Sequence, residues 1–183
     1  LEIFKVNSDV NLYESYCEFW AEIINILFCS FLLTEGKKNK YDSFIKYIEV
    51  LITYEIQFSF FQMVKVLKFM GLRYSDLYSK SDVSEQTRNN FYKENTNVLS
   101  YFVIKTILIN NYESFLEWCD VNNLCLIPFK KTNSNLSEFC NFIKKKYKTK
   151  SMLENEMRAI NLLSKADDPF LINNLRMSVY ELV

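Results

Sequence analysis

Three glutamates are the residues of this chain whose type and spacing could best do chemistry. Glu14, Glu18 and Glu22 recur at intervals of four, so a helix presents them as one acidic stripe, which Asn25 continues. Apolar and aromatic residues surround the stripe, and burying an uncompensated carboxylate is costly. The stripe is therefore solvated, paired with lysine or arginine of the same chain, or turned toward a metal ion.

Other chemistries are excluded by the residue types. The chain has no His, so it cannot build a Ser-His-Asp or Cys-His nucleophile, or a metal site that needs imidazole. No two of its five cysteines have C-x-x-C spacing, which argues against a zinc ribbon or a thioredoxin-like site. Reduced thiols of an intracellular protein are the favoured interpretation. A glycine-rich phosphate loop is also missing.

The composition predicts a helical protein. The chain has 183 residues, of which 49% are hydrophobic, and only 2 Gly and 2 Pro. We expect one all-α domain over residues 1–183, an irregular multi-helix bundle of about six to eight helices. Lys+Arg and Asp+Glu balance at 22 each, so we expect neither nucleic acid nor a membrane as a partner. Abundant Phe, Tyr, Ile, Asn and Lys indicate an A-T-rich genome.

Apolar periodicity gives the elements. We expect helices over residues 11–33, 41–54, 55–70, 98–109, 112–121, 136–148 and 151–164. The second and third could be one bent helix. The polar stretch 78–90 is predicted to be a surface loop, and 170–183 is ambiguous between helix and strand.

Capping residues mark the start of two of these helices. Asp9 or Asn11 can cap the helix over 11–33, and Ser151 with Glu154 has the spacing of a capping box at the start of the helix over 151–164. The run 23–33 is apolar nearly all round but too short to span a membrane, so it is predicted to be a buried core helix.

The segment 13–21, YESYCEFWA, resembles the second zinc-binding helix of gluzincin metallopeptidases, the thermolysin-like group. It is also similar to metallopeptidase-like proteins of giant DNA viruses. Three further pieces share that likeness: residues 61–67 (FQMVKVL), residues 96–98 (TNV) with Tyr101 following, and residues 175–178 (LRMS).

This resemblance assigns roles to single residues. Gluzincins take two zinc ligands from an H-E-x-x-H helix and a third, a Glu, from a later helix. Four positions after that Glu, an acidic residue orients a ligand histidine. The resemblance implies that Glu14 is the zinc ligand and that Glu18 orients the histidine.

The likeness has departures and open points. Tyr13 stands where the family usually has Asn, and Glu18 where it commonly has Asp. Glu18 and Glu22 have the same spacing as Glu14 and Glu18, so the register stays open. Asn97 and Tyr101 lie one turn apart and could line a cleft; a capping Asn and a Tyr at the edge of the core are the alternative.

The missing H-E-x-x-H segment limits what the resemblance implies. We expect the chain, which starts at Leu1 and not at Met, to be the C-terminal part of a longer polypeptide. It would supply one ligand and a cleft wall and hold no catalytic residue of its own. Zinc would bind only together with an upstream His-containing segment, and none would bind to this chain alone.

Partners and location follow from the same resemblance. The expected partners are the upstream part of the same polypeptide or other protein subunits. The expected location is intracellular, in the host cytoplasm or the virion of a large DNA virus. The alternative function is a non-catalytic helical structural or scaffolding protein of such a virus particle, with its apolar surface packed against partners.

Overall fold

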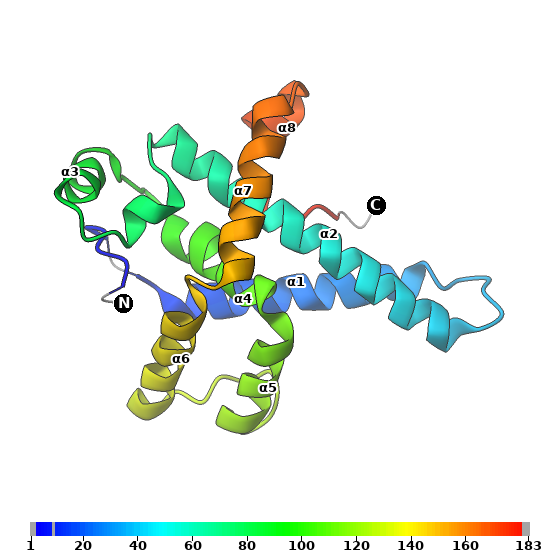
Figure 1. Cartoon of the computed structure of the whole chain (residues 1–183). Coiled ribbons are helices and arrows are strands. Elements are labelled where there is room, and N and C mark those ends of the chain that lie inside the picture. The colour runs from blue at the N-terminus through cyan, green and yellow to red at the C-terminus, as the bar shows by residue number, and fades with distance from the viewer. Residues whose placement is uncertain (1–2, 9, 181–183) are drawn as a thin grey trace.

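The computed structural model describes residues 3–8 and 10–180, which form a bundle of helices without a β-strand (Figure 1). The α-helices are α1 (Leu12–Leu32), α2 (Lys40–Phe69), α3 (Asp82–Phe91), α4 (Lys105–Asn110), α5 (Tyr112–Asn122), α6 (Asn133–Lys146), α7 (Lys150–Lys165) and α8 (Pro169–Asn173). A 3-10 turn, η1 (Tyr74–Leu77), and a π-helical segment, η2 (Leu99–Ile104), complete the described part. The predicted all-α fold is confirmed.

Helices α1 and α2 form a long hairpin that carries the acidic stripe (Figure 1). The Asn11 side chain accepts a hydrogen bond from the backbone N–H of Tyr13 at 3.2 Å, so Asn11 caps α1 as expected. The other predicted cap, Asp9, lies outside the described residues. Gly36, in the connecting turn, has a φ of 73°, a left-handed conformation that favours glycine.

Helix α2 is one helix of 30 residues and not two. No Gly or Pro stands near the expected junction at Tyr54 and Glu55, so nothing interrupts its backbone hydrogen bonds. It ends before Gly71, whose φ is 73°, and the N–H of Leu72 bonds back to the carbonyl of Leu67 at 2.8 Å. The long helix therefore carries residues 51–67 through the core.

The segment η2–α4 is the centre of the molecule. Every residue from 102 to 109 is buried, and the segment packs against both α1 and α2. The helix predicted over 98–109 thus exists, but its first part is π-helical. The Thr106 hydroxyl donates to the carbonyl of Phe102 at 2.6 Å and fixes this turn.

An aromatic cluster joins α5 and α6 to the inner face of α1. The Phe115 ring lies 4.8 Å from that of Phe19 and stacks at 5.5 Å on both Trp118 and Phe139, measured between ring centroids. Aromatic pairs at such distances add to the free energy gained by burial. The cluster fixes the rotation of α1 and hence the direction of the acidic stripe.

The predicted loop over 78–90 is wrong, because most of it is helix α3. Ser81 caps that helix by accepting a hydrogen bond from the N–H of Ser84. Arg88 is buried and donates to the backbone carbonyls of Asp76 and Ser79. The polar residues of this stretch therefore cap and anchor a helix.

The start of α7 also differs from the expectation. Thr149, not Ser151, caps it by accepting a hydrogen bond from the N–H of Met152. Ser151 lies inside the helix, where its hydroxyl bonds to Asn110. Helix α7 crosses α2 and packs against it (Figure 1).

The end of the chain is mostly irregular. Of the ambiguous stretch 170–183, the first residues belong to α8 and the following ones up to Tyr180 are neither helix nor strand. Residues 181–183 lie outside the described part. The irregular segment runs back along α2 toward α1 (Figure 1).

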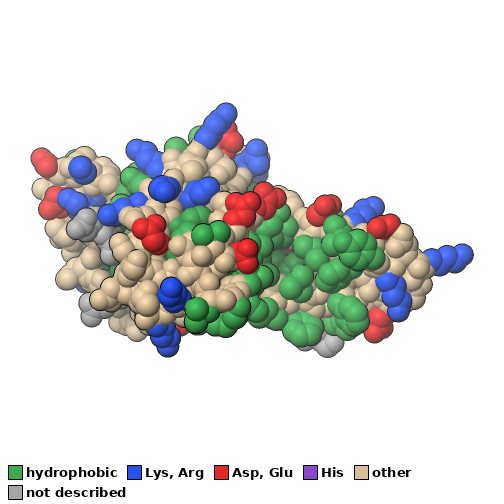
Figure 2. Space-filling model, turned by 90° about the horizontal axis from the view of Figure 1, so that it is seen from below, with side chains coloured by type: hydrophobic (Ala, Val, Ile, Leu, Met, Phe, Trp, Pro, Cys, Tyr) green, Lys and Arg blue, Asp and Glu red, His purple; other side chains and the backbone are tan. Residues whose placement is uncertain are grey.

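The prediction that 23–33 is a buried helix is wrong for its outer face. Ile23 and Ile26 are buried, but Phe28 and Phe31 are 57% and 62% exposed. Figure 2 shows hydrophobic side chains gathered over the half of the molecule that holds the hairpin. The tip of the hairpin extends past the other helices, so nothing in the described residues covers it (Figure 1).

Candidate functional site

The acidic stripe runs from the surface of α1 into the core, so its glutamates meet different surroundings. Glu14 is half-buried at the first turn. Its carboxylate accepts hydrogen bonds from the Tyr101 hydroxyl at 3.1 Å and from the Asn11 amide at 3.4 Å. Both donors are neutral, so they orient the carboxylate without neutralising it.

Of the two residues predicted to line a cleft, Tyr101 bonds to this carboxylate and Asn97 interacts with Tyr101. Tyr101 and Asn97 are both half-exposed, on adjacent turns. The hydrogen bond to Glu14 raises the pKa of Tyr101, because the phenol must keep its proton to donate, while an interaction with Asn97 lowers it. Glu14, Asn97 and Tyr101 thus form one polar group at the surface.

Glu18 lies one turn further along α1. Burial raises its pKa; the Lys105 ammonium opposes that shift and the Glu14 carboxylate adds to it. The charge of Glu18 therefore interacts both with Glu14 at the surface and with Lys105 in the core.

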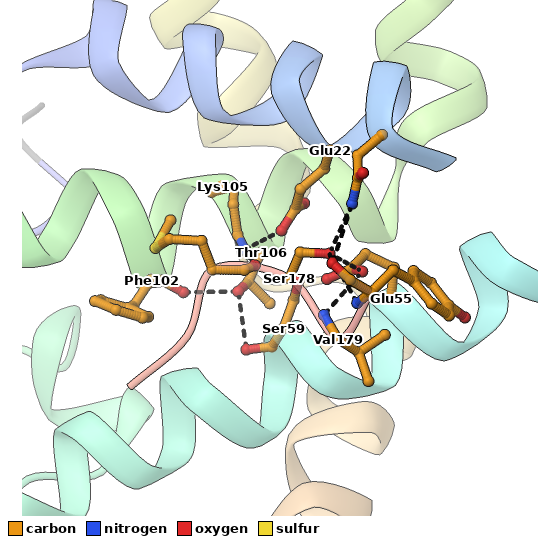
Figure 3. Close-up of polar contacts among 11 residues, drawn as sticks. Glu22, Glu55, Ser59, Phe102, Lys105, Thr106, Ser178 and Val179 are labelled. Carbon is orange, nitrogen blue, oxygen red and sulfur yellow. Dashed lines mark hydrogen bonds and ion pairs between the residues drawn. The ribbon is translucent and has the colours of Figure 1, made fainter. Parts of the chain in front are cut away.

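Glu22 is buried and forms an ion pair with Lys105 of α4 (Figure 3). The expectation that a positive group of the same chain faces the stripe is thereby confirmed at this position. The Lys105 ammonium also donates to the backbone carbonyl of Met177 at 2.9 Å. It therefore ties α1 and α4 to the C-terminal end of the chain.

A further carboxyl group, Glu55 of α2, joins this buried centre (Figure 3). It accepts hydrogen bonds from the Ser178 hydroxyl at 2.9 Å and from the backbone N–H of Val179 at 3.2 Å. Burial raises the pKa of Glu55, while Ser178, Lys105 and Val179 oppose the shift. Asn25, the last residue of the stripe, donates to the Ser178 hydroxyl at 3.2 Å.

The buried centre has two carboxyl groups but only one ammonium group, so the charge of one carboxylate is not balanced. Burial raises the pKa of Glu22 to about 8 in spite of Lys105, and Glu55 adds to the shift. One oxygen of each carboxyl, Oε2 of Glu22 and Oε1 of Glu55, is buried and unsatisfied. A proton shared between the two carboxyl groups would reduce the cost of these unsatisfied oxygens, and the interaction with Glu22 lowers the pKa of Glu55.

Sequence reasoning missed Glu55, Lys105 and Ser178 as members of this centre. One signal was available for Lys105, because it is the one charged residue in the apolar run 102–109. The pairing itself depends on how three helices and the chain end pack, which the spacing of residues does not reveal.

The described residues contain no group of three or more His, Cys, Asp or Glu side chains placed to hold a metal ion. Among the described residues, Glu14 is thus not part of such a group. The chemistry of a metal ligand fits Glu14, because its carboxylate lies at the surface and is held by neutral donors.

Comparison of the chain with protein-family models, with curated proteins and with solved structures finds no match. By length and composition alone, α1 and α2 are apolar enough to cross a membrane, but 44% and 67% of their apolar stretches are buried inside the bundle. Helices of a protein core pass the same test.

Proposed function

We propose that this chain is the C-terminal helical part of a zinc metallopeptidase-like protein of a large DNA virus. Glu14 supplies the carboxylate ligand, and the chain forms one wall of the cleft without being active alone. The proposal is carried by the different surroundings of the three glutamates. Of these, Glu14 alone is both accessible from the surface and bonded to neutral hydrogen-bond donors.

The surroundings of Glu22 support the register in which Glu14 is the ligand. Glu22 is only 3% exposed, and its carboxyl faces Lys105 and Glu55. A zinc ion there would have to replace a buried ammonium and open the core. In the alternative register, with Glu18 as ligand, the orienting residue would be this enclosed Glu22.

Glu18 has the surroundings expected of a residue that orients a ligand histidine. It is half-buried one turn from Glu14, and burial raises its pKa. A carboxylate that accepts a hydrogen bond from a ligand imidazole fixes the ring and raises its basicity. Tyr101 and Asn11 hold the Glu14 carboxylate by hydrogen bonds.

A groove next to Glu14 could accommodate side chains from another part of the protein. It has a volume of about 610 Å³ and lies between α1 and the connector that includes residues 127–129. Tyr13, Cys17 and Ala21 line it from α1, on the face next to that of Glu14. The upstream part of the same polypeptide is the proposed partner on this face.

When bound, zinc would activate water for attack on a peptide carbonyl. This chain's share is to bind the metal through Glu14 and to hold that carboxylate with Tyr101 and Asn11. Glu18 would hold a proton-donating imidazole of the upstream segment in place. Both histidine ligands and the catalytic base belong to that segment.

The test is metal content of the full-length polypeptide that carries this chain, measured by mass spectrometry of the dialysed protein. Glu14→Gln should abolish stoichiometric zinc, and Glu18→Gln should weaken binding by about 10–100-fold. Exposed Glu117 of α5 provides the control, and Glu117→Gln should leave zinc unchanged. Full zinc in the Glu14→Gln protein contradicts the proposal.

The apolar face of the hairpin favours a second candidate, a non-catalytic structural or scaffolding protein of the particle. Phe28, Phe31 and Tyr41 are exposed by 57%, 62% and 72% on the hairpin. Contiguous exposed apolar surface is typical of protein interfaces. In this case Phe28→Ser with Phe31→Ser should lower the copy number of the protein in purified particles, whereas Glu14→Gln should not.

A further inference from the structure

The last irregular segment of the chain, Asn174–Tyr180, is called the C-terminal strap. It lies between α1, α2 and α4, whose charged or polar side chains bond to it (Figure 3); the surface of these helices that it covers is called the groove. None of its seven side chains is buried. Met177 and Tyr180 are partly buried against the hydrophobic core, and polar contacts hold the rest of the strap.

Side chains of the groove form hydrogen bonds mainly with backbone groups of this end of the chain. The Lys65 ammonium donates to the carbonyls of Leu171, at 2.7 Å, and Asn174, and the Lys105 ammonium donates to that of Met177. Glu55 accepts from the N–H of Val179. Lys65, Lys105 and Glu55 are all buried, so the groove presents fixed charges to the strap.

Two side chains of the strap are recognised. The Ser178 hydroxyl donates to Glu55 and accepts from Asn25, so both of its hydrogen-bonding roles are used. The Tyr180 hydroxyl donates to the carbonyl of Leu51 at 3.0 Å. A segment with a hydroxyl residue and, two positions later, a tyrosine therefore makes side-chain hydrogen bonds to both α1 and α2.

An open cavity of about 550 Å³ adjoins the strap. Val179 and Tyr180 line it together with apolar residues of α2 and α7, including Phe61 and Leu162. Val179 is 38% exposed, so its side chain leaves space beside it. A larger apolar side chain at this position would bury more surface in the cavity.

We propose that this groove is a binding site for peptide segments and that the C-terminal strap is its resident, replaceable ligand. Lys65, Lys105 and Glu55 bind the peptide backbone, and Glu55 and Asn25 bind one hydroxyl group. The proposal does not depend on zinc at Glu14.

The test uses a fluorescent peptide with the sequence of residues 171–180 and the 183-residue chain, with binding followed by fluorescence anisotropy. Ser178→Ala in the chain weakens the strap but leaves the groove intact. A hydrogen bond to a charged group is involved, so this chain should bind the peptide at least about tenfold more tightly than wild type. Ser164→Ala, at an exposed serine of α7, should bind it like wild type.

Variants of the peptide test the recognition itself. On the Ser178→Ala chain, a peptide with Ala in place of Ser178 should bind about tenfold more weakly. A peptide with Leu in place of Val179 should bind more tightly because of the cavity. Hydrogen exchange of the Val179 amide in the wild-type chain should become faster when the peptide is added in excess, because the strap leaves the groove.

Equal binding of the peptide to the Ser178→Ala and Ser164→Ala chains overturns the proposal. So does equal binding of the Ser and Ala peptides, or peptide binding that leaves the exchange of Val179 unchanged. Thermal unfolding of each chain confirms that the variants are folded, and zinc content plays no part in any of these readings.

Discussion

Lys105 on α4 and Glu22 on α1 form a buried ion pair, and the same ammonium holds the carbonyl of Met177 near the end of the chain. Residues 83 positions apart in sequence thus meet in the centre of the bundle. With Glu55 from α2, the pair makes this centre the point where three helices and the C-terminal strap are held together (Figure 3).

Removal of the ammonium should destabilise the protein strongly. Lys105→Met leaves Glu22 and Glu55 buried without their cation, and breaking a buried pair in this way typically costs about 3–5 kcal/mol. Urea unfolding at neutral pH measures the loss. Lys46→Met, at an exposed position of α2, is the matched control and should cost well under about 1 kcal/mol. Similar losses from both variants would contradict a central role of Lys105.

The stability of the chain should fall as the pH rises from about 4.5 to about 8 because of Glu22. Its pKa is 4.5 when exposed and about 8 in the folded chain. Between these values the folded state binds more protons than the unfolded state, so raising the pH favours unfolding. Below this range both states are protonated, and above it both are ionised. The groups that face Glu22 are Lys105, Glu55 and Glu18.

Glu22→Gln isolates this effect. Its amide keeps an acceptor for Lys105 and adds donors on the side of Glu55, and it does not titrate. The variant should therefore gain stability relative to wild type as the pH rises toward 8, in urea unfolding measured at several pH values. A difference between the two proteins that does not change with pH would show that Glu22 is ionised throughout.

The fold was largely predictable, because helix formation depends on local patterns. The apolar period of α1, its Asn11 cap and the missing Gly and Pro all act within a few residues. The prediction for residues 78–90 was wrong because the same polar residues are typical both of loops and of helix caps. Ser81 caps α3, and Arg88 anchors the preceding turn, although a stretch with these residues also resembles a loop.

The site was predictable only in part. The four-residue spacing placed Glu14, Glu18 and Glu22 on one face, but it did not show which of them would be enclosed. That depends on Lys105 and Glu55, which come from other helices. The exposed apolar tip of α1 was missed for the same reason, since burial is a property of the assembled bundle.

Tyr101 should report the charge of Glu14 in the chain as it stands. The Glu14 carboxylate raises the pKa of Tyr101 by accepting its hydrogen bond. Glu14→Gln removes the negative charge, so the pKa of Tyr101 should fall toward its ordinary value of 10.0. A pH titration by NMR of chain labelled at the tyrosine ring carbons would measure this. Glu117→Gln is the control, and an unchanged pKa in the Glu14→Gln chain would mean that the hydroxyl and the carboxylate do not interact.

The five free cysteines should separate by their reactivity toward a thiol reagent. Cys17 and Cys125 are exposed, whereas Cys119 is buried and its pKa is raised to about 11 by that burial. In the native chain at neutral pH, Cys17 and Cys125 should react within minutes and Cys119 only after unfolding. Mass spectrometry of the partly labelled protein after digestion identifies the sites. Fast labelling of Cys119 would indicate that α5 opens from the aromatic core, since this thiol lies on the same helix as Phe115 and can be reached only when that packing is lost.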